Sequence, residues 1–494
     1  MLARGSAWFV GLVAFLVSFA WSWQPSYWGD EAASIMSAER SLPSLVGMLD
    51  NVDAVHGLYY LFLHGWIDLF GASELSTRLP SAIAIGIGAA GTVTLARFFM
   101  GSRVAIGGGL IFMILPRVTY MGSEARSTAM ATAIGVWLTV LLVQALRSVT
   151  GSRRRQIVLW SGYSLLLAVG IYLFLYVALL LPVHATVVLV LGYRHHVWRR
   201  TGVRWLGASL LGLLLAAPIF LAGAAQREQI AFIGRRPHVT VSEAAVMQWF
   251  DTVPVAIMAW ALIAVALVAV FLRRSGTHRW TSLPTRSSLL VFLAWMVVPS
   301  VILLVGTRLV TPMYSLRYLS LCAPAVGIVI AVGVAALATH WMRAAAVVAL
   351  VAVIVPTYAE QRGDYAKNDG SDWRQVADII AVEATPGDGV VFDQSVRPSR
   401  IPRLAKHVYP DAFRGLQDVT LTRSYADTGW LWDEVTPLTE VLPAVTNLDR
   451  VWLLQYSGSG ESSRETDVHT LQLQGFHVAE STLVNRTRII EMTR

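Results

Sequence analysis

Two adjacent carboxylates, Asp30 and Glu31, follow the apolar run of residues 8–23 within the stretch SYWGDEAASIM. A carboxylate within hydrogen-bond reach of an alcohol can accept its proton as the oxygen attacks, which accelerates such a reaction by roughly 10²–10⁴. The pair therefore suits a substrate whose hydroxyl group has to be deprotonated. A structural explanation also stands: Asp30 would cap a helix that begins there, and Glu31 would favour the positive end of that helix.

Arginines in other segments supply the opposite charge. Glu124 and Arg126 lie in the stretch GSEARSTAM, and Arg78 and Arg317 lie beside other apolar runs. Guanidinium groups bind phosphates and carboxylates through paired hydrogen bonds, so arginines on the same side of a membrane as Asp30 would suit an anionic headgroup. Because Glu124 and Arg126 are two residues apart, their side chains would pair directly only if the helix were broken at Ala125.

The elements that must position these residues are transmembrane helices. Of the 494 residues, 55% are hydrophobic and only 14% are charged, whereas about a quarter of a soluble protein is charged. The net charge of +8 comes mostly from arginines in short loops, where it reports orientation and not nucleic-acid binding. Apolar runs recur as far as about Tyr358, and both lysines, Lys367 and Lys406, follow that point. We therefore predict a membrane domain over residues 1–357 and an external domain over residues 358–494.

Clusters of arginine predict the orientation, because cytoplasmic loops are enriched in Arg and Lys. With these clusters in the cytoplasm, the N-terminus is cytoplasmic, and Asp30, Glu31, Arg126 and the C-terminal domain are extracytoplasmic. Residues 57–71 suit an interfacial helix better than a span, because Tyr, His, Trp and Asp interrupt the run. The prediction is a multi-pass protein of the cytoplasmic membrane with about eleven transmembrane helices, near residues 6–23, 79–97, 104–121, 127–146, 156–173, 175–192, 203–223, 252–272, 287–306, 318–338 and 344–358.

Several motifs, in order along the chain, resemble those of the GT-C glycosyltransferases. YWGDEAAS is similar to the acidic motif in their first external loop, and HGLYYLFLHGWIDLFGASELSTRLPSAI is similar to their interfacial helix and the arginine that opens the second span. GSEARSTAM resembles their Glu-Ala-Arg element, SLRYLSLCAPAV their late Arg-Tyr element, and SDWRQVADII the start of their external domain. The resemblance is closest to the glycosyltransferase family 39 branch, with its protein O-mannosyltransferases, aminoarabinose transferases and actinobacterial enzymes. One departure is Gly57, where the family often has proline.

The resemblance implies a GT-C fold with interfacial helices and an inverting transfer of a sugar from a polyprenyl-phosphate carrier to an extracytoplasmic hydroxyl group. In that reaction Asp30 would be the general base, and Glu31 would orient the loop, the acceptor or a cation. The departing phosphate gains negative charge and needs fixed positive charge beside it. Arg126 is the first candidate for this role, followed by Arg78 and Arg317, although an arginine at a span's end can also simply mark the interface.

Other residues are candidates for the substrate pocket. Tyr27 and Trp28 could line it, although aromatic residues are also enriched at the ends of spans for reasons of solvation. The complete set of pocket candidates is Tyr27, Trp28, His56, Tyr60, Glu124 and Tyr318.

A metal site is not predicted. Asp53, His56, Tyr60 and His64 would share one helical stripe, but nothing in the sequence completes a set of ligands there. A divalent cation, Mg²⁺ or Mn²⁺, could still help to hold the donor phosphate, and no other cofactor is indicated.

The C-terminal sequence predicts a small α/β domain. Ser371 would cap a helix at DWRQVADIIAVEA, strands would follow at GVVFD and RVWLLQY, and a helix near SRETDVHTLQLQG would precede a hairpin of FHVAESTLV with TRIIEMTR. This domain could bind the acceptor or could serve as a structural cap.

The competing class is a lipid or sugar transporter or flippase without transferase activity. Transporters usually place ionisable residues inside their spans and often show repeated halves. Here the predicted spans are nearly free of charge at their centres and no repeat is visible, which favours a transferase; a catalytically silent scaffold is a third alternative. The sequence does not reveal the sugar; the resemblance favours mannose or arabinofuranose, and it leaves a glycan, a lipid and a protein open as acceptors.

Overall fold

The computed structural model describes residues 2–148, 151–194, 198–228, 239–272, 283–309, 313–368, 370–458 and 461–494. Contacts divide the chain into two compact units. The helical unit comprises residues 1–20, 54–59 and 78–359, and the sheet unit comprises residues 21–53, 60–77 and 360–494. The sheet unit therefore combines the C-terminal part of the chain with most of the segment between the first two apolar helices.

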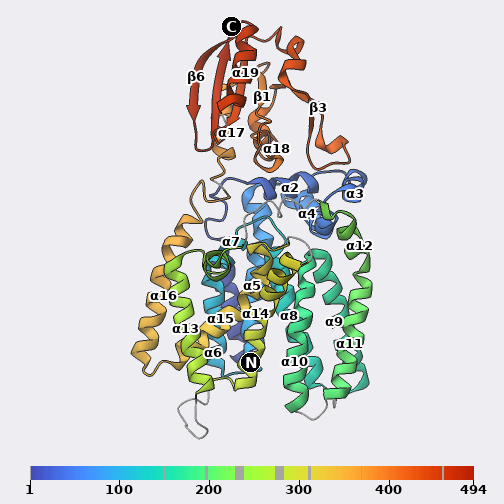
Figure 1. The fold of residues 1–494 in the computed structure, drawn as a ribbon, viewed down its shortest axis with the longest axis vertical. Helices are drawn as coiled ribbons and strands as arrows, with labels where there is room; N and C mark the ends of the chain where they lie inside the picture. The colour runs from blue at the N-terminus through green and yellow to red at the C-terminus, as the bar shows by residue number, and fades with distance from the viewer. Residues whose placement is uncertain are drawn as a thin grey trace. The chain divides into compact units, whose positions relative to one another are not determined.

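The helical unit is built from long apolar helices that run alongside one another (Figure 1). Short connections such as α7 (Pro116–Met121), η2 (Leu175–Leu179) and η6 (Leu316–Cys322) link some of them. The long helices and their bounds are α1 (Leu2–Phe19), α5 (Glu74–Ala96), α6 (Ser102–Ile114), α8 (Thr128–Arg147), α9 (Arg153–Leu173), α10 (Leu180–Arg194), α11 (Trp198–Leu215), α12 (Ala217–Ala225), α13 (Val253–Phe271), α14 (Arg286–Leu309), α15 (Ala323–Ala336) and α16 (His340–Glu360).

The prediction of a multi-pass helical protein is confirmed. Among the described residues, eight helical segments are long and apolar enough to cross a membrane, and the bent pair α11–α12 makes up to nine. Two shorter apolar helices, Gly5–Phe19 and Ser102–Ile114, fall at the two other positions of the predicted eleven. Residues 57–71 are not among the candidate spans; they form α4 (Gly57–Phe70), of 14 residues, whose Leu61, Phe62, Leu69 and Phe70 side chains are exposed.

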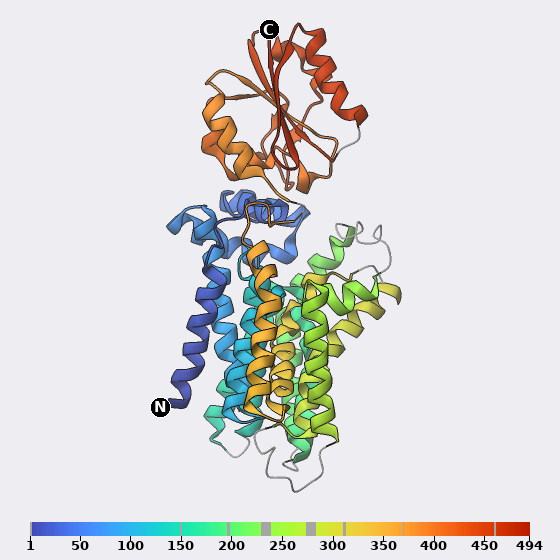
Figure 2. The ribbon, with the colours of Figure 1, turned by 90° about the vertical axis from the view of Figure 1, so that its left-hand side faces the viewer.

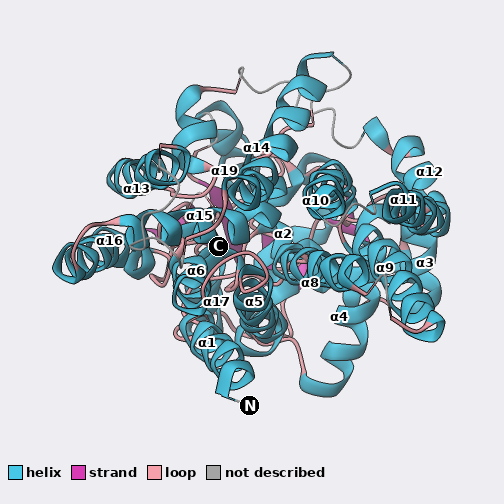
Figure 3. Ribbon diagram, turned by 90° about the horizontal axis from the view of Figure 1, so that it is seen from below, coloured by secondary structure: helices cyan, strands magenta, loops and turns pink. Residues whose placement is uncertain are grey.

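Close helix packing in this unit depends on small residues. Helix α15 lies among α6, α13 and α14 (Figure 3), and most of its residues are buried. A Cβ atom on Gly333 would lie 2.0 Å from the main-chain oxygen of Leu262 in α13, and one on Gly327 would lie 2.8 Å from the main-chain nitrogen of Phe112 in α6. Only glycine permits such an approach, which is typical of helix pairs in membranes.

Two predicted spans are not single helices: residues 203–223 form the bent pair α11–α12, and residues 104–121 also divide into two helices. The structure ends α6 at Ile114, and Pro116 begins the separate helix α7, so residues 104–121 are not one continuous helix. Proline lacks the N–H group that a continuing helix would use, and it disfavours the helical conformation for the residue before it. As a consequence, Arg117 lies beyond the end of the apolar helix.

The sheet unit contains a five-stranded sheet in the order β2-β1-β5-β7-β6. Strand β1 pairs in parallel with β2 and β5, and β7 pairs antiparallel with both β5 and β6. A two-stranded ribbon of β3 and β4 accompanies it. The strands are β1 (Gly389–Phe392), β2 (Gln417–Asp418), β3 (Leu421–Arg423), β4 (Glu434–Val435), β5 (Arg450–Tyr456), β6 (His477–Leu483) and β7 (Thr487–Thr493).

Helices cover both faces of this sheet. Figure 2 shows α17 (Trp373–Glu383) and α19 (Glu461–Leu473) on opposite sides of the strands. The side chains of β5 alternate accordingly: Trp452 and Leu454 pack in the core with Trp373, whereas Val451 and Leu453 pack in the core with Leu471. The predicted α/β domain, with its strands, its two helices and its closing hairpin, is confirmed.

The first of these cores also includes residues from far upstream. Helix α2 (Gly29–Ala38) contributes Ala32, Ile35 and Met36, which are spaced so that they lie on one helical face. They are buried together with Trp373 of α17 and Leu404 of α18 (Leu404–Val408). The residues after the first apolar helix are therefore an integral layer of the sheet unit.

The predicted cap of α17 is wrong by one residue. Asp372, not Ser371, precedes the helix, and its buried carboxylate accepts hydrogen bonds from the main-chain N–H groups of Asn485, Arg486 and Thr487 at 2.7–3.1 Å. Asp372 thus joins α17 to the turn between β6 and β7 instead of capping its own helix.

Candidate functional site

The acidic pair lies in the first turn of α2. Gly29 begins the helix, Trp28 precedes it in an extended conformation, and no side chain caps its first turn. The alternative in which Asp30 is the N-cap is therefore wrong. Both carboxylates still lie at the positive end of the helix, where negative charge is favoured.

The two carboxylates differ in burial. Glu31 is fully buried, whereas Asp30 is partly exposed. A proton acceptor has to reach its substrate, so the exposure of Asp30 favours it as the base. The burial of Glu31 favours an orienting role within the protein.

The aromatic pocket candidates of the sheet unit are buried. Tyr27 and Tyr60 have no exposed surface, and Trp28 is 2% exposed. The hydroxyl group of Tyr60 donates to Asp53 Oδ2 over 2.9 Å, and that of Tyr27 donates to the main-chain oxygen of Ala72 over 3.0 Å. These positions favour a role in holding the segment around Asp30 over direct contact with a substrate.

In the helical unit, a break in the helices carries the Glu-Ala-Arg element. Residues 122–127 lie between α7 and α8 and are not helical, which meets the condition for Glu124 and Arg126 to face each other. Ser81 Oγ in α5 donates to the main-chain oxygens of Glu124 and Arg126 over 2.6 and 3.2 Å. Arg78 lies three residues before Ser81, on the same face of that helix.

The arginine candidates for the phosphate site differ in how far their side chains are buried. Arg78 is fully buried, whereas Arg126 and Arg317 are partly exposed. A buried guanidinium group is costly unless protein groups use its donors, so the burial of Arg78 favours a structural role. Arg126 and Arg317 remain the better placed candidates for an incoming phosphate.

Arg117 belongs to the same polar region and was missed in the sequence. Its Nε and one of its terminal nitrogens donate to the main-chain oxygens of Gln248 and Met247 over 3.2 and 2.8 Å. Asp251, Arg317 and Glu124 are charged groups near enough to Arg117 to interact with it electrostatically. The available signal was the arginine inside a predicted span, because an ionisable residue there is a functional candidate by default.

Tyr318 and His56 occupy short 3₁₀ turns of the helical unit. Tyr318 follows Arg317 in η6, and its ring stacks on that of Tyr176 with 4.2 Å between centroids. His56 ends η1 (Ala54–His56), and both Tyr318 and His56 are partly exposed. Asp30, Glu31, Tyr27, Trp28 and Tyr60 belong to the sheet unit, whereas the other candidates belong to the helical unit.

The histidine stripe does not assemble a metal site in the described residues. No group of three or more His, Cys, Asp or Glu side chains in that part of the chain could hold a metal ion. His64 instead has its Nδ1 2.7 Å from the main-chain oxygen of Ala38, with its Nε2 3.6 Å from Asp68.

Comparisons with known proteins bear on the family and the fold of this chain. The family model described as dolichyl-phosphate-mannose-protein mannosyltransferase matches residues 58–221, which include Arg78, Glu124 and Arg126. A search of curated proteins found no match.

Two solved structures of ArnT from Cupriavidus metallidurans are similar over nearly their whole length. The structure bound to undecaprenyl phosphate has a TM-score of 0.60 and 14% identity, and the match covers 98% of this chain and 97% of that one. The apo structure has a TM-score of 0.57 and 15% identity, with 99% and 98% covered. At this identity the likeness shows the fold. The chain is a GT-C-fold protein that is similar to glycosyltransferase family 39.

Proposed function

We propose that this chain is a membrane glycosyltransferase that moves a sugar from a polyprenyl-phosphate carrier to an extracytoplasmic hydroxyl group with inversion. One observation carries the proposal: a chain with the ArnT-like fold presents a partly exposed carboxylate, Asp30, in the first turn of the helix that follows its first apolar helix. The ArnT structure with undecaprenyl phosphate and the matching family model both support a polyprenyl-type carrier.

The reaction is a single displacement at the anomeric carbon. The acceptor oxygen forms a bond to that carbon while the bond from carbon to the phosphate oxygen breaks. The proton of the acceptor hydroxyl passes to the carboxylate of Asp30, and Glu31, buried beside it in the chain, orients that segment.

The phosphate leaves with an additional negative charge. Arg126 and Arg317 provide positive charge fixed by the protein, and Arg78 supports the helix to which the Arg126 loop is bonded. Tyr318 and His56, both partly exposed in the helical unit, are the pocket residues best placed to contact the sugar or the carrier. A divalent cation could assist at the phosphate.

The sugar is mannose or arabinofuranose in this proposal, and the acceptor is a glycan, a glycolipid or a protein of the cell envelope. The protein would lie in the cytoplasmic membrane, with its N-terminus inside and Asp30 and the sheet unit outside.

The test is turnover by the purified full chain in lipid nanodiscs. Mannosyl- and arabinofuranosyl-undecaprenyl phosphate serve as donors, octyl glycosides serve as acceptors, and the release of undecaprenyl phosphate is measured. We expect release with one donor and a loss of about 10²–10⁴ in kcat for Asp30→Asn. Asp68→Asn, which removes an exposed carboxylate of α4, is the matched control and should keep the wild-type rate.

Two results would overturn the proposal. The first is an absence of carrier release with every donor from a correctly folded protein, and the second is a wild-type rate for Asp30→Asn. In vesicles of the same lipid composition, transfer of the donor lipid from one leaflet to the other without release of undecaprenyl phosphate would support the transporter alternative instead.

A further inference from the structure

The start of α2 is held by residues from the C-terminal part of the sheet unit. A Cβ atom on Gly29 would lie 2.2 Å from the main-chain oxygen of Ser399, so the backbone just before Asp30 touches η7 (Pro398–Arg400). Together with the burial of Ile35 and Met36 in the core of α17 and α18, this contact fixes both the position and the direction of α2.

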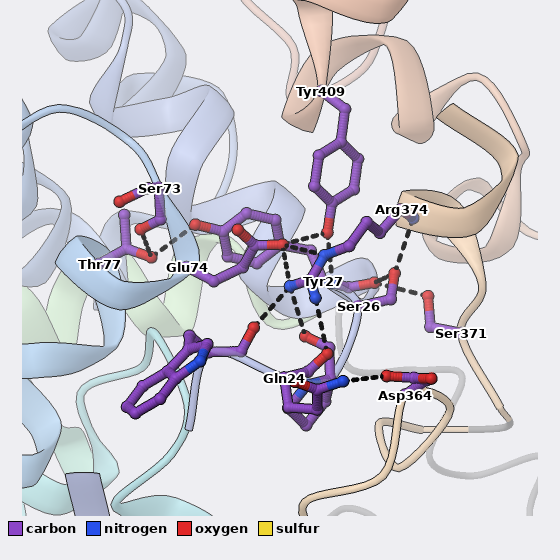
Figure 4. A network of polar contacts seen from close by, with 12 residues as sticks. Gln24, Ser26, Tyr27, Ser73, Glu74, Thr77, Asp364, Ser371, Arg374 and Tyr409 are labelled. Atoms are coloured by element: carbon purple, nitrogen blue, oxygen red, sulfur yellow. Dashed lines mark hydrogen bonds and ion pairs between the residues drawn. The ribbon is translucent and has the colours of Figure 1, made fainter. Parts of the chain in front are cut away.

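Tyr27 is held through its main chain as well as its side chain. Its N–H donates to Tyr409 Oη over 3.0 Å, and its carbonyl oxygen accepts from Ser371 Oγ over 2.5 Å. Its own hydroxyl group lies 2.7 Å from Thr77 Oγ1 (Figure 4). Tyr27, three residues before Asp30, therefore has little freedom to move.

Arg374 of α17 forms hydrogen bonds with the residues before Tyr27. Two of its guanidinium nitrogens donate to Glu74 Oε1 over 2.9 and 2.5 Å, and its terminal nitrogens donate to the main-chain oxygens of Gln24 and Trp23 over 2.8 and 2.6 Å. Its own main-chain N–H donates to Ser26 Oγ over 3.1 Å.

The carboxylate of Glu74 completes the arrangement. Tyr409 Oη donates to Glu74 Oε1 over 2.6 Å and accepts a hydrogen bond from the main-chain N–H of Tyr27. One oxygen of Glu74 therefore accepts hydrogen bonds from both Arg374 and Tyr409. The side chains of Arg374 and Glu74 are only 24% and 15% exposed. Burial alone would lower the pKa of Arg374, but the charge of Glu74 and the hydroxyl of Tyr409 raise it, so the guanidinium stays charged.

We propose that Arg374, Glu74 and Tyr409 are positioning residues for the transfer reaction, because they fix the segment that carries Asp30. The inference rests on the proposed function, and it adds that residues far from Asp30 in the sequence control the rate of transfer without touching a substrate. The planar guanidinium group binds a carboxylate and two carbonyl groups through a rigid fork of donors, whereas the three donors of an ammonium group share one nitrogen and cannot reproduce that geometry. A misplacement of about 1 Å at a reacting group can cost on the order of 10² in rate.

The test uses Arg374→Ala, Arg374→Lys and Tyr409→Phe in the full chain, assayed by carrier release from whichever of the two donors the wild type uses. For Arg374→Ala we expect kcat to fall about 10²-fold, with KM for the donor within about twofold of the wild type. Arg374→Lys should recover part of the loss. Tyr409→Phe, which removes a single oxygen atom, keeps the test open if Arg374→Ala does not fold, and it should lower kcat by a smaller factor.

A double-mutant cycle separates positioning from a general effect on structure. If Arg374 acts through Asp30, Arg374→Ala should not slow the residual, single-turnover reaction of Asp30→Asn any further, because effects of residues that act as a unit are not additive. Arg450→Ala is the matched control: Arg450 also forms ion pairs in this unit, with Glu491 and Asp388, and none of its described bonds reaches residues 21–77.

Four outcomes are decisive. An unchanged kcat for both Arg374→Ala and Tyr409→Phe would overturn the inference, and so would an equal loss of rate in the wild-type and Asp30→Asn backgrounds. If Asp30→Asn itself keeps the wild-type rate, the proposed function fails first. If Asp30→Asn loses its activity while Arg374→Ala keeps the wild-type kcat, only the positioning role fails.

Discussion

The hydroxyl group of Ser81 lies 2.6 Å from the main-chain oxygen of Glu124 and 3.2 Å from that of Arg126. A single side chain in α5 thus bonds twice to the non-helical residues between α7 and α8. Because Ser81 is fully buried, no solvent molecule from the surface can replace these bonds without rearrangement of the helices.

Ser81→Ala should therefore both destabilise the helical unit and weaken donor binding. Loss of a buried hydrogen bond that leaves its acceptor unsatisfied costs about 1–3 kcal/mol, and the loop with Arg126 should become less ordered. We expect a lower Tm and a raised KM for the donor. Thr92→Val, in the same helix, removes a hydroxyl that bonds to Gly88 of its own helix, so it should leave KM unchanged; equal KM values for the two variants would contradict the role of Ser81.

Substitution of the exposed arginines tests the phosphate site. If the proposed phosphate site is correct, Arg126→Gln and Arg317→Gln should each lower kcat by roughly 10²–10³, because each would remove fixed positive charge from that site. Lysine at either position should restore part of the rate. Arg103→Gln, at the exposed start of α6, is the control with the same change of charge, and a loss as large as that of Arg126→Gln would point to net charge and not to the site.

Gly29→Ala tests whether α2 must lie directly against η7. The added methyl group would meet the main-chain oxygen of Ser399 at 2.2 Å, so α2 or η7 has to shift. We expect a fall in kcat of about 10-fold or more from the displaced carboxylate of Asp30. Gly47→Ala places the same methyl group in open space on α3 (Leu42–Asn51) and should leave kcat unchanged; a wild-type rate for Gly29→Ala would refute the prediction.

Acid should weaken the sheet unit through Asp433. Burial alone would raise the pKa of Asp433, but the hydrogen bond and charge of His407, the Tyr425 amide and Arg403 hold it below its ordinary value of 3.8. The carboxylate accepts from His407 Nε2 over 2.6 Å and from the Tyr425 N–H over 2.7 Å.

A carboxyl group whose pKa is lower in the folded state stabilises the protein above pH 3.8, and this contribution is lost as the pH falls through the folded-state pKa. The Tm of the wild type should therefore fall between pH 5 and pH 3, as measured by the thermal unfolding of the full chain. Asp433→Asn should start from a lower Tm at pH 6 and should show a shallower fall. Parallel curves for the two proteins would exclude Asp433 as a source of the acid sensitivity.

The local patterns in the sequence were sufficient for most elements. The short apolar run in RVWLLQY and the apolar length of the spans are local signals, and β5, β7, α17 and α19 appear where these patterns predict them. The break after α6 was also visible as Pro116 and Arg117, but the apolar residues around them dominated the interpretation.

The candidate site was predictable only in part. Asp30, Glu124 and Arg126 could be chosen from residue type and order, yet their burial could not, and burial is what separates Asp30 from Glu31 and Arg126 from Arg78. The Arg374–Glu74 ion pair joins residues 300 positions apart, and no local pattern specifies which arginine meets which carboxylate over such a separation.

The shared core of α2 and α17 also has a consequence for biosynthesis. Ile35 emerges from the ribosome more than 300 residues before Trp373, with which it is buried, so the early segment stays without its apolar partners while most of the helices are inserted. Chaperone protection or lipid contact has to cover that surface during translation. A chain interrupted before Trp373 would present it as a site for aggregation or proteolysis.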